Sequence, residues 1–341
     1  MNKTNLLSRK IKPFNPREVN SIEDALIAFQ SCSFQARNLG KALDILSEMM
    51  EDQKCMRVLC LSGAMIPAGL EELICQMIEE KVIHFIVTTG ANIIHSILNS
   101  FDQDNQAHYI GHPDANDIEL NKHGIDRIYD VFVTESSYEK TEDMLEQLIA
   151  KLFPRNKRHI LTPSQFFSKL GKHLKGRCFI KIAAEYGVPI FNPAFSDSEL
   201  GMDMIHFKAY KEMDIIIDNV KDIDIFAKHL LRNHGTRYGS IIVGGGVPRN
   251  WAQQVFPYLQ YLLKRQREKV DDESLYSGYM YSVRFHSAIP QDGGLSGCTV
   301  SEGISWGKYS HKAKYVSVWG DATISFPLAI TALFQRMARK E

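Results

Sequence analysis

Short apolar segments followed by helical patterns recur along the chain. Residues 57–63, RVLCLSG, precede the helical pattern of 68–81, and residues 83–92, IHFIVTTGAN, precede IIHSIL. The same order recurs in GSIIVGGGVP (239–248) and in YVSVWGDAT (315–323), which FPLAITALFQRM follows. Apolar runs without alternation are typical of strands that are buried on both faces of a parallel sheet. The pattern predicts an α/β fold, a doubly wound and mostly parallel sheet with helices on both faces.

Other segments complete this picture. Ser21, with Asp24 three residues later, predicts the capped start of a helix that continues through residues 25–50. Residues 130–153 predict a strand and a helix joined by a loop from Thr134 to Ser137, and YMYSVRF (279–285) predicts another strand. The charged run at 264–279 is interpreted as a solvated helix end and loop rather than a nucleic-acid contact. We expect a polar arm over residues 1–20 and one domain over 21–341.

Composition excludes some classes of protein. The 341 residues hold 40 basic and 40 acidic side chains, so the net basic charge expected of a nucleic-acid binder is missing. No apolar run is long enough to span a membrane, and the N-terminal residues contain no continuous apolar signal segment. The six cysteines form no CxxC pair and are expected to be reduced thiols, so we predict a cytoplasmic protein without a metal.

Turns at the predicted strand ends are candidate binding loops. Gly244, Gly245 and Gly246 stand between a strand and a helix, where backbone N–H groups can approach a phosphate, but three glycines equally suit a tight structural turn. Open α/β sheets bind ligands at the carboxyl ends of their strands. Asp321 there either accepts hydrogen bonds from a ribose or caps the following helix, and Asp197 either binds in the same way or lies in an ordinary turn.

Two further groups of residues are candidates for chemistry. His108 and His112 have the i, i+4 spacing of a metal site on a helix, but the intervening Gly111 and the following Pro113 indicate a loop. Lys308 stands between glycine and aromatic residues in SEGISWGK, beside Trp306 and near Glu302. A lysine is a nucleophile only when it is neutral, which desolvation favours. From these residues alone, Lys308 is either an imine-forming lysine or a surface lysine at the end of an element.

Several segments in order resemble the deoxyhypusine synthase family: SFQARNLG (33–40), GGGVP (244–248), QDGG (291–294), SEGISWGK (301–308) and GDATISFPL (320–328). The resemblance extends from about residue 20 to residue 338, and SWGK with the downstream DAT and FPL is its most specific part. It implies a Rossmann-like fold, a homotetramer with active sites at a dimer interface, and NAD as cofactor. It also implies transfer of a 4-aminobutyl group from spermidine through an imine on Lys308.

The resemblance assigns site residues position by position. The cofactor-binding positions are Gly63, Ala64, Met65, Ile66, Pro67, Thr89, Gly90, Ala91, Asp197, Gly245, Ser287, Ala288, Asp321 and Ala322. The substrate-binding positions are Asp203, Asp292, Gly293, Glu302 and Trp306, with Lys308 as the nucleophile. DSELGMD (197–203) holds one residue more than the family pattern, which leaves the register of Asp203 open.

Departures from the family pattern concern the amine pocket. Ile94 and His95 stand where a pair of glutamates is expected, Asn250 replaces a catalytic histidine, and Leu295 replaces an acidic residue. Loss of these carboxylates predicts weaker spermidine binding unless the substrate differs. His95 is the candidate replacement for proton transfer, because imidazole titrates near neutral pH.

The departures leave two acceptors open. The acceptor is either a small diamine such as putrescine, giving homospermidine, or a lysine of a protein, giving deoxyhypusine; the small amine is slightly favoured. The alternative of a different class is a non-catalytic NAD-binding or regulatory protein on the same scaffold.

Overall fold

The computed structural model describes the chain except for residues 1–6, 103–106, 156, 233–235, 267–277 and 341. Two compact units are distinguished within it. Unit 1 comprises residues 1–57, 235–245 and 260–341, and unit 2 comprises residues 58–234 and 246–259. The predicted division into an arm and a single domain stays a prediction. Most of the charged run at 264–279 lies outside the described residues.

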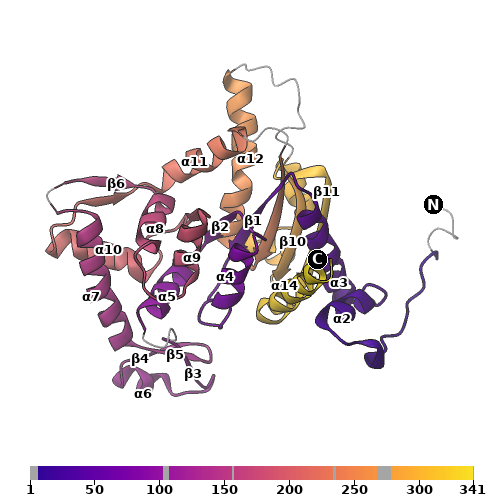
Figure 1. Ribbon diagram of the computed structural model, residues 1–341, viewed down its shortest axis with the longest axis horizontal. Coiled ribbons are helices and arrows are strands. Elements are labelled where there is room, and N and C mark those ends of the chain that lie inside the picture. Colours follow the sequence, from indigo (N-terminus) through magenta and orange to yellow (C-terminus); the bar gives the residue numbers. More distant parts are fainter. Residues whose placement is uncertain (1–6, 103–106, 156, 233–235, 267–277, 341) are drawn as a thin grey trace. The chain divides into compact units, whose positions relative to one another are not determined.

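Unit 1 is built from parallel strands and the helices packed on them (Figure 1). Its regular elements are η1 (Pro16–Glu18), α2 (Ile22–Phe29), α3 (Phe34–Glu51), β9 (Arg237–Val243), β10 (Tyr279–His286), η3 (Pro290–Asp292), η4 (Leu295–Gly297), α13 (Val300–Ser305), β11 (Tyr309–Trp319) and α14 (Ala322–Ala338). The strand β10 pairs in parallel with β9 on one side and with β11 on the other. The helices α3 and α14 pack on β10.

The N-terminal helices differ from the sequence prediction. Ser21 caps α2 as predicted, its hydroxyl oxygen accepting a hydrogen bond from the backbone N–H of Asp24 at 3.0 Å. The helix then ends at Phe29, whereas the sequence predicted continuous helix to residue 50. Phe34, the first residue of α3, has a φ of 55°, outside the range of the right-handed α-helix, so the chain turns between α2 and α3.

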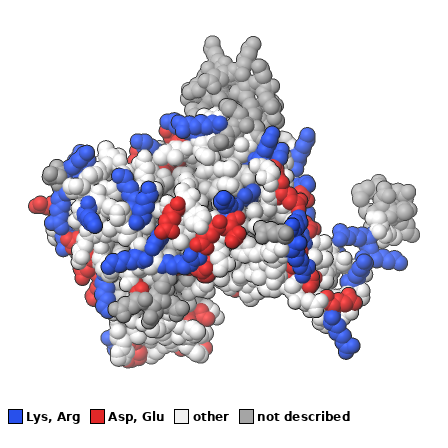
Figure 2. All heavy atoms as spheres, in the orientation of Figure 1, with Lys and Arg blue, Asp and Glu red and all other residues white. Residues whose placement is uncertain are grey.

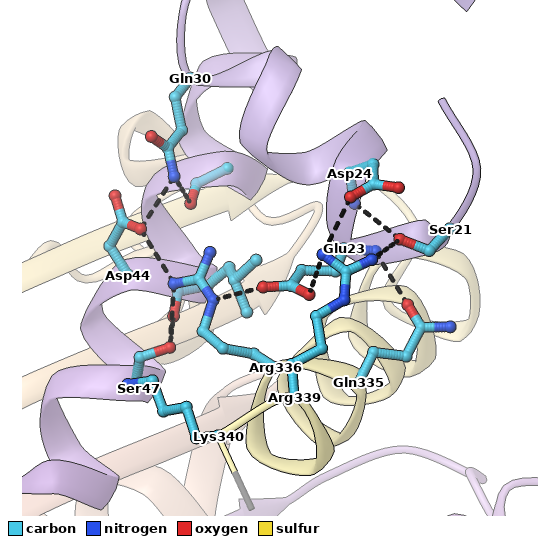
Figure 3. Close-up of polar contacts among 12 residues, drawn as sticks. Ser21, Glu23, Asp24, Gln30, Asp44, Ser47, Gln335, Arg336, Arg339 and Lys340 are labelled. Atoms are coloured by element: carbon cyan, nitrogen blue, oxygen red, sulfur yellow. Dashed lines mark hydrogen bonds and ion pairs between the residues drawn. The ribbon is translucent and has the colours of Figure 1, made fainter. Parts of the chain in front are cut away.

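A polar network joins α2, α3 and α14 (Figure 3). Arg336 donates to Glu23 at 2.9 Å, to Asp44 at 3.3 Å and to the hydroxyl of Ser47 at 3.0 Å. Arg339 pairs with both Glu23 and Asp24. Because Glu23 is buried, its carboxylate depends on these guanidinium partners, and the network fixes the three helices to one another.

Unit 2 has a second set of parallel strands and two small accessory sheets. Its elements are β1 (Cys55–Leu61), whose first residues belong to unit 1, α4 (Glu71–Glu79), β2 (Phe85–Thr88), α5 (Gly90–Phe101), β3 (Tyr109–Ile110), α6 (Asp117–Lys122), β4 (Ile125–Ile128), β5 (Val131–Thr134), α7 (Glu135–Leu152), β6 (His159–Leu161), α8 (Pro163–Gly171), α9 (Phe179–Tyr186), β7 (Ile190–Phe191), α10 (Glu199–Tyr210), β8 (Ile215–Ile217), α11 (Asn219–Arg232) and α12 (Gly246–Gln266), whose last residues belong to unit 1.

Pairing in unit 2 is parallel between β1 and β2, between β2 and β7, and between β6 and β8. Only the small sheet of β3, β5 and β4 is antiparallel among the pairings described. The predicted loop from Thr134 to Ser137 was wrong: α7 begins at Glu135, and Thr134 caps it by accepting from the N–H of Ser137. The predicted α/β class, a mostly parallel sheet with helices around it, is confirmed.

Surface charge and helix length agree with the composition. On the face shown in Figure 2, acidic and basic side chains are interspersed. Among the described residues, no helix combines the length and apolarity that crossing a bilayer requires.

Candidate functional site

Lys308 lies in a turn of unit 1 that we call the lysine turn, residues 303–309, between α13 and β11. The side chain of Lys308 is 7% exposed, and its Nζ lies 5.6 Å from the centroid of the Trp306 ring. This distance is within the range of a cation–π contact when the amine is charged. The surface-lysine alternative is therefore wrong for this residue.

Backbone contacts hold the lysine turn in place. The N–H of Lys308 donates to the carbonyl of Gly303 at 3.0 Å, and the carbonyl of Lys308 accepts from the N–H of Tyr279 on β10 at 3.0 Å. Gly307 has a φ of 70°, a conformation that favours glycine, and a Cβ there would stand 2.8 Å from the side-chain oxygen of Gln260. The glycines of SEGISWGK thus bring the lysine inward and leave its neighbour Trp306 62% exposed.

The other substrate positions predicted in unit 1 are exposed. Asp292 ends η3, and its carboxylate accepts from the N–H of Gly294 at 2.7 Å, next to Gly293 with a φ of 72°. Glu302 lies on α13, where its backbone N–H donates to the hydroxyl of Thr299. Both carboxylates are in solvent, as an amine-binding group at the mouth of a site would be.

The turn at Gly245 is packed rather than open. A Cβ at Gly245 would stand 2.8 Å from Nη2 of Arg284 and 2.8 Å from Cα of Ser296. Arg284, 1% exposed, donates to the carbonyls of Gly244 at 3.1 Å, Cys298 at 2.9 Å and Ser296. This arrangement supports the structural interpretation of the glycine turn, and the role of Gly245 toward NAD stays a prediction.

Asp321 caps α14, one of the two roles weighed for it. Its Oδ1 accepts from the N–H and from the hydroxyl of Thr323, at 2.7 and 2.8 Å. Ala322 is the first residue of α14, and Ser287 and Ala288 follow β10. These predicted cofactor positions all come after the parallel strands of unit 1.

In unit 2, the structure brings several predicted cofactor positions together. The side-chain oxygen of Asn92 accepts from the N–H groups of Met65 and Ile66 at 3.0 and 3.3 Å, and its amide donates to Thr88 and Thr89. The hydroxyl of Thr89 donates to the carbonyl of Gly63 at 3.3 Å. Asn92, which the sequence analysis missed, therefore ties the loop from Gly63 to Pro67 to the start of α5.

The start of α5 also meets the loop that carries Asp197. A Cβ at Gly90 would stand 2.3 Å from Cβ of Ser198 and 2.9 Å from the carbonyl of Asp197, so only glycine fits. Thr89 makes no side-chain cap, and the N–H groups of Gly90 and Ala91 have no hydrogen-bond partner among the described residues. Uncapped N–H groups at the start of a twelve-residue helix fit the pyrophosphate of a dinucleotide.

A pocket of about 480 Å³ in unit 2, which we call the acidic pocket, contains seven carboxylates. It is lined by Ala91, Ile94, His95, Asp126, Glu135, Tyr138, Glu139, Glu142, Asp197, Ser198, Glu199 and Asp203. Three of the glutamates lie on one face of α7 at i, i+4 and i+7 spacing. The sequence analysis missed this face, although the spacing was visible, and it predicted an amine pocket depleted of carboxylates.

Asp203 is the buried carboxylate of the acidic pocket. It is 6% exposed and has no hydrogen-bond or ion-pair partner among the described residues. Burial first, and then the neighbouring Glu142 and Glu199, raise the pKa of Asp203 to about 7. An unpaired buried carboxylate of this kind is suited to receive a cation. The structure thus places Asp203 in the same pocket as His95, despite the extra residue in its segment.

His95 lies on α5 at the inner side of the acidic pocket. It is 5% exposed, its Nδ1 is 2.9 Å from Nε2 of His108, and its ring meets the edge of Tyr138. Burial and the adjacent His108 lower the pKa of His95 to about 3. His95 is therefore neutral at neutral pH. Asn250, the other catalytic position, lies on α12 and is half-buried.

His108 and His112 do not form the pair that an i, i+4 spacing on a helix would allow. His108 contacts His95, whereas Nδ1 of His112 accepts from the N–H of Asp114, and the strand β3 lies between them. The loop interpretation is confirmed. Within the described ranges, no three His, Cys, Asp or Glu side chains are grouped to hold a metal.

Comparison with known proteins shows the family of the chain. The family model for deoxyhypusine synthase matches residues 25–333. The chain belongs to the deoxyhypusine synthase family. It is 36% identical over 298 residues to a probable deoxyhypusine synthase 2 of Archaeoglobus fulgidus, which covers 86% of this chain and 92% of that protein. A deoxyhypusine synthase-like protein of Chlorobaculum parvum is 33% identical, with 87% and 81% covered.

A solved structure supports the fold of this deoxyhypusine synthase family member. A putative deoxyhypusine synthase from Entamoeba histolytica has a TM-score of 0.61 over 95% of this chain and 97% of that one. At 19% identity, the likeness concerns the fold alone.

Proposed function

We propose that this member of the deoxyhypusine synthase family is an NAD-dependent transferase that moves a 4-aminobutyl group from a polyamine through an imine on Lys308. The observation that carries the proposal is the burial of Lys308 against Trp306, because an amine shielded from water more readily becomes the neutral nucleophile. The same shielding protects an imine from hydrolysis.

The acidic pocket supplies the second part of the proposal, a site for the polycation. Spermidine carries several positive charges, and the carboxylates of α7 with Asp203 offer acceptors at several depths of one pocket. They compensate for the glutamate and the acidic residue that His95 and Leu295 replace in the family pattern. The expected weakness of spermidine binding therefore does not follow from those two positions alone.

The residues around α5 fit NAD. The loop from Gly63 to Pro67, Thr89 and the free N–H groups of Gly90 and Ala91 would hold the pyrophosphate, and Asp197 and Asp321 would accept from the ribose hydroxyls. Bound there, NAD would accept a hydride from the carbon next to the secondary amine of the donor. Ser287, Ala288, Ala322 and Gly245 complete the proposed set.

The chain's own groups carry the transfer. The secondary ammonium of the donor must lose a proton before a hydride can leave. Asp203 and His95 line the acidic pocket and would accept a hydrogen bond from this N–H. The neutral Nζ of Lys308 then attacks the imine carbon, and 1,3-diaminopropane leaves with the former secondary nitrogen. An acceptor amine displaces Lys308 in the same way, and return of the hydride gives the stable secondary amine product.

The partners remain those expected of the family. We propose a homotetramer whose sites lie at a dimer interface. Large apolar side chains exposed on unit 1 suit such an interface; they are Ile289, Leu295, Trp306, Trp319 and Ile324. The acceptor is either a small diamine or a lysine of a protein.

Borohydride trapping tests the function. The protein is incubated with NAD and with spermidine, putrescine or agmatine in separate reactions. Each reaction is then reduced with borohydride, and the mass of the intact protein is measured. We expect a stable adduct whose added mass corresponds to the transferred group. Lys308→Ala should show no such increase in mass. No adduct with any amine, although NAD binds, would indicate a non-catalytic NAD-binding protein. Product analysis with putrescine or an added protein then distinguishes homospermidine from deoxyhypusine.

A further inference from the structure

A chain of hydrogen bonds leads from His95 away from the acidic pocket to a buried carboxylate. Nδ1 of His95 lies 2.9 Å from Nε2 of His108, and Nδ1 of His108 lies 3.0 Å from Oδ1 of Asn99. The amide nitrogen of Asn99 donates to Glu71 at 2.6 Å. We call these four residues the histidine relay.

The direction of each hydrogen bond follows from its fixed end. Oε1 of Glu71 accepts from the backbone N–H of Phe179 at 3.1 Å and from the hydroxyl of Ser96, and burial raises the pKa of Glu71, so its contact with Asn99 does not by itself orient the amide. The N–H of Ala107, which can only donate, lies 3.2 Å from Oδ1 of Asn99. This contact orients the Asn99 amide, with its oxygen toward His108 and its nitrogen toward Glu71. His108 must therefore carry a hydrogen on Nδ1.

The charge state of the two imidazoles completes the assignment. Burial lowers the pKa of His108 to about 4, and His95 is neutral as well. A neutral imidazole carries one N–H. With its hydrogen on Nδ1, His108 presents a bare Nε2, so the hydrogen between the two rings belongs to Nδ1 of His95. Nε2 of His95 is then left without a hydrogen.

The unprotonated Nε2 of His95 contacts no hydrogen-bond donor within the described structure. His95 lines the acidic pocket, and its Nε2 has no hydrogen-bond partner among the described residues. Nε2 of His95 is not fully enclosed by protein, because it is not among the buried polar atoms without a partner. A ligand in the pocket can therefore reach it. The titratable groups that share this pocket are Asp203 and Glu199 from α10, Glu135, Tyr138, Glu139 and Glu142 from α7, with Asp126 and Asp197.

We propose that Glu71, Asn99 and His108 are positioning residues that fix His95 as the tautomer whose Nε2 accepts a hydrogen bond from a cationic substrate nitrogen. The tautomer is a property of the protein alone, whereas the identity of the donor as a substrate ammonium rests on the proposed function. In the other tautomer, the N–H at Nε2 of His95 would face the N–H of the substrate ammonium. Two hydrogen-bond donors would then face each other, which would weaken amine binding. The relay thus makes His95 a hydrogen-bond acceptor for the amine, beside Asp203, whose pKa lies nearer to neutral pH.

The tautomer is measured without any substrate. Full-length protein with ring-15N histidine is compared with His95→Gln, which identifies the signal of His95 among the 12 histidines. We expect Nδ1 protonated and Nε2 bare between pH 6 and 8. In His108→Phe, the one-sided tautomer should be lost, because the acceptor for Nδ1–H is gone. His112→Phe is the matched control, since His112 follows β3 only four residues after His108 and contacts Asp114 instead, and it should leave the signal unchanged. A protonated Nε2 in the unaltered protein would overturn the inference.

Amine binding is measured in parallel by calorimetry with NAD present. In His108→Phe, we expect spermidine to bind about 10- to 100-fold more weakly, as for loss of a hydrogen bond to a charged group, and His112→Phe to bind as before. Equal affinity in His108→Phe, with the tautomer lost, would show that the relay does not serve amine binding. The two proposals fail separately: the absence of an imine adduct leaves the tautomer result standing, and a wrong tautomer leaves the adduct standing.

Discussion

The lysine turn of unit 1 and the acidic pocket of unit 2 are two candidate sites that are built in different ways. The lysine turn is one continuous segment, held by backbone hydrogen bonds and by glycines that allow a close approach. The acidic pocket collects its carboxylates from β4, α7, α10 and the loop before α10. A reactive group needs one shielded position, whereas a polycation needs charges at several positions, which separate elements supply.

The difference also appears in electrostatics. Lys308 lies beside an aromatic side chain, while the carboxylates of the pocket act on one another: in addition to burial, which is the larger cause, Glu142 and Glu199 raise the pKa of Asp203. Tyr138, between Asp126 and Glu199, has its pKa raised to about 12, mainly by burial. A pocket that repels its own negative charge gains most when a cation enters.

The largest effect is expected at the lysine turn. Lys308→Ala should lower the rate of transfer about a thousandfold or more, because it removes the atom that forms the covalent bond. Rates of product formation from spermidine and putrescine measure this. Lys312→Ala on β11, an exposed lysine four positions away, is the control and should retain activity. Activity that survives in Lys308→Ala would remove the lysine turn from the mechanism.

Mixed subunits test whether the two parts act together across an interface. Asp203→Asn should weaken spermidine binding about 10- to 100-fold, as for a lost charged hydrogen bond. If sites are shared between subunits, tetramers that combine Lys308→Ala with Asp203→Asn subunits regain activity, because some sites contain both unaltered groups. Tetramers of the double variant serve as control. No regain in mixtures of proven composition would contradict the shared site.

Arg284 is the residue on which the loops of unit 1 depend most. Arg284→Met should lower the free energy of unfolding by about 2 to 4 kcal/mol, because buried carbonyls of Gly244, Ser296 and Cys298 lose their donor. Arg158→Met is the control: Arg158 is 66% exposed and its partner Asp214 is 34% exposed, so less than about 1 kcal/mol is expected. Urea unfolding of both variants measures the difference, and equal losses would refute the role of Arg284.

The glutamates of α7 should have smaller effects on binding. Glu139→Gln and Glu142→Gln should each weaken spermidine binding about two- to fivefold at low salt, because partly exposed charges contribute modestly. The loss should shrink as salt is added. Asp143→Asn, on the same helix but outside the pocket, should bind normally. Glutamine variants that bind as tightly as the parent would exclude the α7 face.

The smallest effect is expected in the pH dependence of the free energy of unfolding, where the contributions of two histidines and of Asp203 partly cancel. The pKa values of His95 and His108 are lowered to about 3 and 4 in the folded chain. Below pH 6.5 the unfolded chain therefore binds more protons at these two residues than the folded chain does, and their contribution to the free energy of unfolding falls as the pH is lowered. The pKa of Asp203 is raised to about 7, so it acts in the opposite direction between pH 4 and 7. Because two histidines act against one carboxyl group, about one proton stays uncompensated, and we expect the free energy of unfolding to fall by up to about 1.4 kcal/mol for each unit that the pH is lowered between pH 6.5 and 4.5.

Asp203→Asn should uncover the contribution of the histidines. Relative to the parent, its unfolding free energy should fall by up to about 1.4 kcal/mol more for each unit that the pH is lowered within this window. Denaturant unfolding at several pH values measures the slope. Parallel pH profiles for the two proteins would show that Asp203 is not neutral in the folded state.

Parts of the fold and site were predictable because their signals are local. Apolar runs followed by glycine turns gave the parallel strands, and the cap at Ser21 marked the start of α2. The break before Phe34 was missed, because residues 25–50 keep a helical pattern on both sides of it. The role of Asn92 was also missed, since its partners Met65 and Ile66 lie 26 or more positions away.

The sequence by itself determined the class of fold, the family and the position of the lysine turn, because these depend on periodicity and on contiguous motifs. Only the tertiary structure decided that Lys308 is buried, that seven carboxylates share one pocket, and that His95 faces His108. Burial and pKa depend on side chains that arrive from separate elements, and no local spacing encodes those distances. For that reason, a pocket in which His95 stands at an expected acidic position is rich in carboxylates in the folded chain.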